Sequence, residues 1–258
     1  MTGEQIVILV VAGLAVGFIN TLAGGGSVIS LTVLMLLGLP ANVANGTNRV
    51  AILIQNIGAV GNFSKHKTLD SKKGLLLAIP AVVGAMVGAG IATHLPEEVI
   101  RKAIAWVLVL MFFVLLVRPK RWIEGAAHLT GRPVQWWQYV LFFFIGIYGG
   151  FIHVGVGYML LAGIVLGAGY DLVKANAIKV FIILLWTPLS LLVFWLDGQV
   201  NWIYGLILGI GNFTGALIAS QIAVKKGANF VRWIVLAIIL VMALHMFGVI
   251  DLKSVIGL

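Results

Sequence analysis

The sequence predicts an all-α integral membrane protein that consists of two inverted-topology repeats. The first observation is the composition, 61% hydrophobic and 10% charged, which is typical of membrane proteins and not of water-soluble domains. The second is that charged residues gather between long apolar runs, several of which exceed the roughly 20 residues that cross a bilayer. The third is that short motifs of the first half recur, in the same order, in the second half.

The recurring motifs set the boundaries of the repeats. Three segments of the first half match segments of the second: 17–26 matches 150–157, 44–48 matches 175–179, and 84–93 matches 211–220. Each match is weak alone, but their shared order makes chance a poor explanation. We therefore expect a first transmembrane repeat at 1–117, a cytoplasmic linker at 118–133 and a second transmembrane repeat at 134–258.

The first repeat opens with a run that is too long for one crossing. Positions 5 to 48 contain no charged residue, and a continuous helix of that length would extend about 66 Å across a hydrocarbon core of about 30 Å. We expect 5–38 to form a re-entrant or broken helical hairpin that turns at Gly24, Gly25 and Gly26. Three transmembrane helices then follow at 41–63, 74–95 and 99–117.

The second repeat follows the same plan. A run without charged residues from 133 to 170 predicts a second hairpin at 136–169, with its turn at Gly155 and Gly157. Three transmembrane helices are expected at 172–196, 201–223 and 230–249. Glycines spaced four residues apart, at 84 and 88 and at 211 and 215, are expected to permit close helix packing, and such faces are also compatible with a homodimer.

The basic residues predict the orientation, because Lys and Arg concentrate in cytoplasmic loops. They gather in the loop after 41–63, in the linker and in the loop before the last span, whereas the loop at Asp197 has none. The loop after 41–63 is therefore inside and its counterpart after 172–196 is outside, so the repeats are inverted. The two glycine turns then approach the midplane from opposite sides, as in secondary transporters. The alternative is that the glycines serve only close helix packing.

The first glycine turn has the features of an anion site. Gly24-Gly25-Gly26-Ser27 lies where a helix would restart, and N–H groups at a helix N-terminus attract anions. Irregular backbone at this depth is tolerated where protein or a water-filled cavity satisfies its polar groups. The turn lacks the Gly-Lys-Ser/Thr ending of a nucleotide-binding loop, so transport would be secondary or passive.

Polar and ionisable residues near the two turns are the candidates for substrate contact. Buried amides and hydroxyls in a membrane core are either interhelical hydrogen bonds or ligand contacts. Arg49 and Lys179 lie about 12 Å from the membrane surface, a depth at which an ionisable side chain indicates function. Snorkelling towards the headgroups is the alternative, and it is stronger for Arg49. His153 is suited to proton coupling because histidine titrates near neutral pH, with a helix contact as the alternative.

The absence of certain residue types narrows the substrate and the chemistry. No Asp or Glu lies within a predicted span, although a transporter of Na⁺ or organic cations would normally need one. The interior therefore favours an anion. A convergent group of His, Asp and Glu is also lacking, which argues against an enzyme. The chain has no cysteine, which excludes a thiol-bound metal, and we expect no cofactor. Nucleic acid is not expected, because the basic residues lie in short loops that set orientation.

Three stretches together resemble a known family. The run Gly17-Phe18-Ile19-Asn20-Thr21-Leu22-Ala23-Gly24-Gly25-Gly26-Ser27, the later Gly46-Thr47-Asn48 and the second glycine-rich copy at 150–157 are similar to the TauE/SafE family of membrane permeases. The resemblance covers essentially the whole chain. It implies a multi-pass protein of the bacterial inner (plasma) membrane that exports or takes up small sulfur-containing anions, such as sulfite or organosulfonates.

The sequence therefore predicts a secondary transporter, acting as an exporter of such anions by alternating access between inverted repeats. A passive anion channel, or a transporter of another small anion, is the alternative. The predicted partners of the protein are the small anion, the lipid bilayer, a coupled proton and a second copy of the chain. The candidate substrate-binding residues lie at the two turns and on the spans beside them: Asn20, Thr21, Gly24, Gly25, Gly26, Ser27, Asn45, Thr47, Asn48, Arg49, His153, Gly155, Gly157, Asn176 and Lys179.

Overall fold

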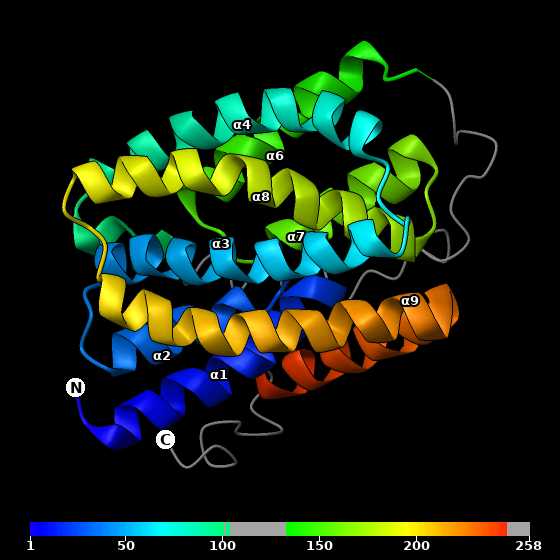
Figure 1. The fold of residues 1–258 in the computed structure, drawn as a ribbon. Coiled ribbons are helices and arrows are strands. Elements are labelled where there is room, and N and C mark those ends of the chain that lie inside the picture. The colour runs from blue at the N-terminus through cyan, green and yellow to red at the C-terminus, as the bar shows by residue number, and fades with distance from the viewer. Residues whose placement is uncertain (101, 104–132, 247–258) are drawn as a thin grey trace.

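The computed structural model describes residues 1–100, 102–103 and 133–246. Every regular element among these residues is a helix, as the sequence predicts (Figure 1). The predicted span at 99–117 and the predicted linker at 118–133 fall almost wholly outside the described residues.

The first half contains α1 (Gly3–Leu22), α2 (Ser27–Leu36), α3 (Ala41–Lys65) and α4 (Ser71–Thr93). α1 begins at a capping box, in which the Thr2 hydroxyl accepts the Gln5 N–H and the Gln5 side chain accepts the Thr2 N–H. α1 and α2 form the hairpin predicted at 5–38. The helix breaks between them near Gly24, whose φ of 94° is readily adopted by glycine.

The second half repeats this order. α6 (Trp136–Phe151), α7 (Val156–Ala162) and the π-helical turn η3 (Gly163–Gly167) form the hairpin predicted at 136–169. α8 (Leu172–Leu196) matches a predicted span and is capped by the Asp171 carboxylate, which accepts two N–H groups of its first turn. α9 (Trp202–Met246) leaves helical geometry at Gly227 and so corresponds to the predicted span 201–223 and to the described part, up to 246, of the predicted span 230–249.

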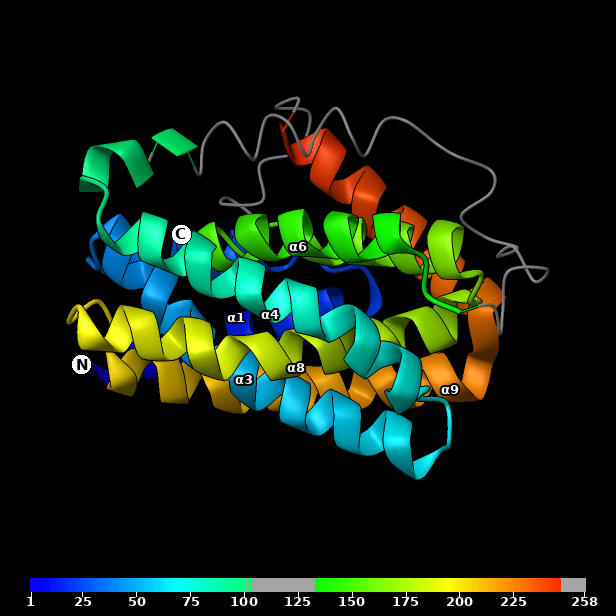
Figure 2. The same cartoon turned by 90° about the horizontal axis from the view of Figure 1, so that it is seen from above.

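The helices of the two halves pack crosswise. α1 of the first half packs on α9 of the second, and α6 of the second half packs on α4 of the first. α3 likewise packs on α9 and α8 on α4, while α3 and α8 pack on each other. Figure 1 shows α4, α6 and α8 in the upper part of the bundle and α1, α3 and α9 in the lower part. From above, α4 lies alongside α6 and α8 (Figure 2). The halves are therefore interleaved.

Small residues permit the closest of these contacts. A Cβ at Gly17 of α1 would overlap the backbone of Asn212 in α9, and one at Gly150 of α6 would overlap the backbone of Ala85 in α4. The glycines at 84, 88, 211 and 215 form the other sides of the same two contacts, which confirms their predicted packing role. These four glycines pack inside the chain, so a homodimer stays a prediction that would need another face.

Four described helices are long and apolar enough to cross a membrane: α1, α4, α8 and the Trp202–Gly227 part of α9. α3 is as long as α8 but carries many buried polar side chains, and it lies between α8 and α9. Polar side chains at membrane depth face the interior of a bundle because their exposure to lipid is costly. α3 therefore brings polar groups to the centre of the chain, beside the two hairpins.

Candidate functional site

The two broken helices meet inside the bundle. Residues 23–26 connect α1 to α2, and we call them the first tip; residues 152–155 connect α6 to α7 and form the second tip. Gly24 of the first tip lies against Gly157, just beyond the second tip. A Cβ on either glycine would overlap the backbone of the other, so the contact requires glycine on both sides. The two predicted glycine turns thus come together.

Lys179 caps the C-terminal end of α1. Its Nζ lies 2.9 Å from the carbonyl oxygen of Asn20, 2.8 Å from that of Thr21 and 2.6 Å from Oδ1 of Asn176. An ammonium has three donors, and these three oxygens use all of them. The side chain is fully buried. A cation is favourable here because the carbonyls that end a helix carry partial negative charge.

Arg49 caps the C-terminal end of α6 in the same way. Its Nη1 lies 2.6 Å from the carbonyl oxygen of Gly149, and its Nη2 lies 2.8 Å from that of Gly150. Nη2 also lies 3.4 Å from Oδ1 of Asn45, and Nη1 lies 3.4 Å from Nδ1 of His153. The guanidinium is fully buried, so Arg49 does not snorkel towards the headgroups.

The two caps are crossed between the halves. Lys179 belongs to α8 of the second half and binds α1 of the first, whereas Arg49 belongs to α3 of the first half and binds α6 of the second. Each cation is oriented by an asparagine about one turn earlier on its own helix, Asn176 or Asn45. The asparagines match in the internal repeat. The hairpin of each half is therefore held in place by a helix of the other half: α8 holds the first hairpin and α3 holds the second.

The side chains around the two tips differ. At the first tip, Asn20 Nδ2 lies 3.3 Å from Ser27 Oγ and 3.3 Å from Gln55 Oε1. At the second tip, the ring of His153 meets the ring of Trp186 edge-on, with centroids 6.0 Å apart. Gln55 and Trp186 each lie ten residues after the orienting asparagine of their helix. Matching positions thus supply amides to one tip and aromatic rings to the other.

Several buried polar atoms near the tips have no hydrogen-bond partner among the described residues. They are Thr21 Oγ1, both amide atoms of Asn48, Arg49 Nε, Asn176 Nδ2 and Trp186 Nε1. Buried polar atoms in folded proteins are nearly always paired, so such a group needs a reason. Four of the six are N–H donors, which a ligand rich in acceptor oxygens would satisfy. No group of three or more His, Cys, Asp or Glu that could hold a metal occurs in the described parts.

The remaining predicted residues take different positions. Ser27 and Gly25 lie at the first tip, where Gly25 packs against the ring of Tyr158. Thr47 faces α9 instead, because its hydroxyl accepts the N–H of Asn201 at 2.9 Å. The sequence analysis missed Trp186 and Gln55. The signal for both was their matched place in the repeat.

A further contact joins the halves at the end of the bundle where α4 and α8 begin. The Tyr170 hydroxyl donates to Asp70, whose other oxygen accepts the N–H of Lys73 at 3.0 Å. Burial raises the pKa of Asp70, but the hydrogen bonds from Tyr170 and the Lys73 amide and the charges of Lys73 and Lys174 together hold this pKa below its ordinary value. Burial and the contact with Asp70 raise the pKa of Tyr170.

The apolar helices and the two broken helices that meet between them define the class: a multi-pass membrane transporter, not an enzyme. The chain belongs to the sulfite exporter TauE/SafE family, whose model matches residues 9–246.

Curated relatives agree with this class. The chain is 28% identical to the probable membrane transporter protein ORF9 of Sinorhizobium sp, over 93% of this chain and 91% of that protein. It is 28% identical to the probable membrane transporter protein YfcA of Escherichia coli (strain K12), over 92% and 87%. It is 26% identical to the probable membrane transporter protein YunE of Bacillus subtilis (strain 168), over 84% and 88%. No solved structure matches the chain significantly.

Proposed function

We propose that the protein is a secondary transporter that exports a small sulfur-containing oxyanion, such as sulfite or an organosulfonate, across the bacterial inner membrane. The observation that carries this proposal is the set of unpaired N–H donors beside two buried cations at the touching tips. The family description supplies the sulfur anion. The relatives' names support transport and say nothing of the substrate.

The cations and the neutral donors would have separate roles. Lys179 directs its three protons at protein oxygens, so it would attract the anion by its charge and not by a direct hydrogen bond. The Nε of Arg49 and the side-chain N–H groups of Asn48, Asn176 and Trp186 have no partner among the described residues. These groups would donate hydrogen bonds to the oxygens of the anion. Because these donors are fixed by packing, they bind charge more strongly than mobile water would in a site of low dielectric constant.

Alternating access between two inverted repeats would move the anion. The crosswise pairing supports this mechanism, since α1 with α9 and α6 with α4 are equivalent contacts in a two-fold arrangement. The glycine contact between the tips supports it too, because Gly24 and Gly157 lie in the two segments, 17–26 and 150–157, that match in the internal repeat. A rocking of one half against the other would then open the tips to opposite sides in turn.

Sulfite flux in liposomes that contain the purified chain tests the proposal. The flux should saturate with sulfite concentration and should proceed against a sulfite gradient when a proton gradient is imposed. Asn48→Ala should raise the KM by about 10- to 100-fold, since a hydrogen bond to a charged group contributes about 1.5–3 kcal/mol. Asn62→Ala is the matched control on α3, because Asn62 Nδ2 pairs with Ser220 at 3.0 Å.

Two outcomes would contradict this assignment. A flux that never saturates and never runs uphill would indicate the passive anion channel instead. A KM for Asn48→Ala equal to that of the Asn62→Ala control would remove Asn48 from the site.

A further inference from the structure

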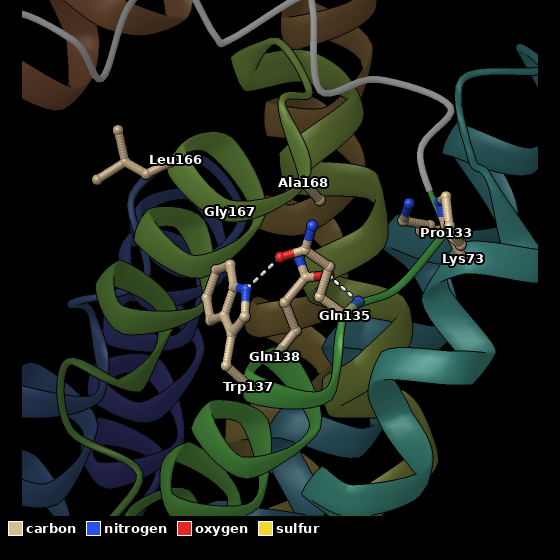
Figure 3. Close-up of a pocket in the computed structure, with 8 residues that line it drawn as sticks. All are labelled: Lys73, Pro133, Gln135, Trp137, Gln138, Leu166, Gly167 and Ala168. Atoms are coloured by element: carbon tan, nitrogen blue, oxygen red, sulfur yellow. Dashed lines mark hydrogen bonds between the residues drawn. The ribbon is translucent and has the colours of Figure 1, made fainter.

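A small hollow lies at the end of the bundle where α4 and α6 begin, separate from the two tips (Figure 3). Lys73 of α4 lines it from the first half of the chain. Trp137 and Gln138 of α6, with Gly167 at the end of η3, line it from the second half. Its volume is about 70 Å³, so it has room for a small ion and not for a larger ligand.

The hydrogen bonds within this hollow fix the orientation of two side-chain amides. The backbone N–H of Gln135 donates to Gln138 Oε1 at 2.8 Å, and the indole Nε1 of Trp137 donates to Gln135 Oε1 at 2.6 Å (Figure 3). Both partners can only donate, so each amide must turn its oxygen towards the protein. The NH₂ groups of both amides are therefore the atoms left for a ligand.

Gln138 is the decisive side chain. It is 2% exposed, and its Nε2 has no hydrogen-bond partner among the described residues. A buried donor without an acceptor is costly and is usually satisfied by a ligand or an ordered water. A Cβ at Gly167 would come within 3.4 Å of this Nε2, so the absence of a side chain there keeps the donor accessible.

The charge around the hollow favours an anion. Lys73 belongs to its lining, and none of the described lining residues is acidic. Asp70, whose carboxylate accepts the Tyr170 hydroxyl and the Lys73 N–H, also interacts with the charge of Lys73, but Asp70 does not line the hollow. A cation and an unpaired amide N–H, at the start of two helices, together match the acceptor oxygens of an oxyanion.

We propose that this hollow is a second anion site, which binds one tetrahedral oxyanion between Lys73 and Gln138 at the end of the bundle that the basic loops predict to be cytoplasmic. The ligand contacts both halves of the chain, beside the Asp70–Tyr170 contact that joins them. This second site does not depend on the central site or on the direction of transport.

Cysteine accessibility tests the site, because the natural chain has no cysteine. Leu166→Cys places a thiol at the hollow, where Leu166 is 41% exposed, and Leu196→Cys places one at the far end of α8, where Leu196 is 75% exposed. The rate of maleimide labelling of the purified chain in detergent is measured with sodium sulfate or sodium methanesulfonate. Sodium chloride at equal ionic strength is the reference. A separate arm adds phosphatidylglycerol, whose headgroup carries the same kind of oxyanion.

We expect sulfate to slow labelling at position 166 by about tenfold when its concentration is ten times the Kd, because the rate follows the unoccupied fraction. Labelling at 196 should not change. Protection by phosphatidylglycerol alone would identify the oxyanion as a lipid headgroup, while protection by sulfate or methanesulfonate identifies a free anion. Protection should disappear in Gln138→Glu, which keeps the shape but removes the donor, and in Lys73→Gln.

The inference is overturned if no oxyanion protects position 166, if 166 and 196 are protected equally, or if protection survives in both variants. Repeating the protection in the Asn48→Ala chain separates this site from the tips. Protection that persists there, together with a raised KM for sulfite, assigns the two effects to two different sites. Protection lost in Asn48→Ala would show that the hollow is not independent of the tips and would overturn the proposal.

Discussion

The first and second tips share a backbone arrangement but not the chemistry around it. In both, a helix ends inside the bundle and a cation from the other half binds its last carbonyls. The first tip has the amides of Asn20 and Gln55 and the Ser27 hydroxyl beside it, as well as the ring of Tyr158. The second has the rings of His153, Trp186 and Phe194 beside it, as well as the amide of Asn45. The internal repeat therefore specifies the backbone, and the side chains that differ between the copies specify what each tip can bind.

The identity of each cation fits its surroundings. A lysine ammonium is compact, and Lys179 binds three oxygens with its three donors. A guanidinium is planar and packs on rings, and Arg49 reaches two successive carbonyls while its Cζ lies 5.3 Å from the ring centroid of Phe194. The two tips are thus not interchangeable, although they are related by the same repeat.

Removal of a capping cation should have the largest effect. Lys179→Met leaves two carbonyls and the Asn176 oxygen without their donor, which should lower the free energy of unfolding by about 3 kcal/mol at about 1 kcal/mol for each acceptor. Arg49→Met should have a similar effect at the second tip. Thermal unfolding of the purified chains measures the loss. The control is Lys174→Met, since Lys174 is exposed on the same helix, and equal stability of Lys179→Met and this control would refute the cap.

Exchange of the cations tests whether the tips are interchangeable. Arg49→Lys cannot bind both carbonyls and pack on Phe194, so we expect a loss of about 1–2 kcal/mol. Lys179→Arg forces a larger side chain into a fully buried place, at a cost of about 2 kcal/mol. The double variant, Arg49→Lys with Lys179→Arg, should be no more stable than the less stable of the two single variants, as measured by urea unfolding. Recovery of the natural stability would show that the surroundings of the tips do not matter.

Trp186 should separate substrate binding from stability. Trp186→Phe removes an N–H that has no partner among the described residues and keeps most of the ring volume, so the free energy of unfolding should fall by less than about 1.5 kcal/mol. The apparent affinity for sulfite should fall about tenfold if the indole N–H contacts the anion. The KM in liposomes measures this. The control is Trp195→Phe, because Trp195 is 54% exposed on the same helix, and an unchanged KM would leave Trp186 with a packing role only.

Removal of the Asp70–Tyr170 contact, which joins the halves away from both tips, should have the smallest effect on the free energy of unfolding. The folded pKa of Asp70 lies below its ordinary value of about 4, so ionised Asp70 stabilises the folded chain above about pH 4, and this contribution is lost as the pH falls through the folded pKa. Asp70→Asn should remove that acid dependence and cost less than about 1 kcal/mol at neutral pH, since solvent screens a partly exposed group. Unfolding temperatures from pH 3 to pH 7 test this, and Tyr170→Phe should weaken the same dependence. If stability depends on pH in Asp70→Asn as it does in the natural chain, Asp70 is not the source of the acid dependence.

The hairpins and most spans could be predicted because their cause is local. The run without charge from position 5 to 48 is too long for one crossing, and glycines mark its break. The depth of Arg49 and Lys179 could also be predicted, because it follows from their position within a span. The π-helical turn at the end of the second hairpin could not, since its residues are as apolar as those of the preceding helix.

The partners of the site residues could not be predicted. Lys179 and Arg49 bind backbone carbonyls of the other half, and a carbonyl carries no sequence signal of its own. Trp186 looked like any apolar residue of an apolar helix, and its unpaired N–H is visible only once its neighbours are placed. Thr47 was expected in the site because it is a polar residue in a segment of the internal repeat, but its direction on α3 turns it towards the start of α9.

The crossed caps also constrain how the chain is made. Segments enter a membrane in order from the N-terminus, and Lys179 follows Thr21, whose carbonyl it binds, by 158 positions. The end of α1 is therefore inserted with unpaired carbonyls, at several kcal/mol each in lipid, until α8 is synthesised. α6 meets no such delay, because Arg49 precedes it. The cap of the first hairpin therefore forms late in biosynthesis, whereas Arg49, which caps the second hairpin, is already in the membrane when that hairpin is inserted.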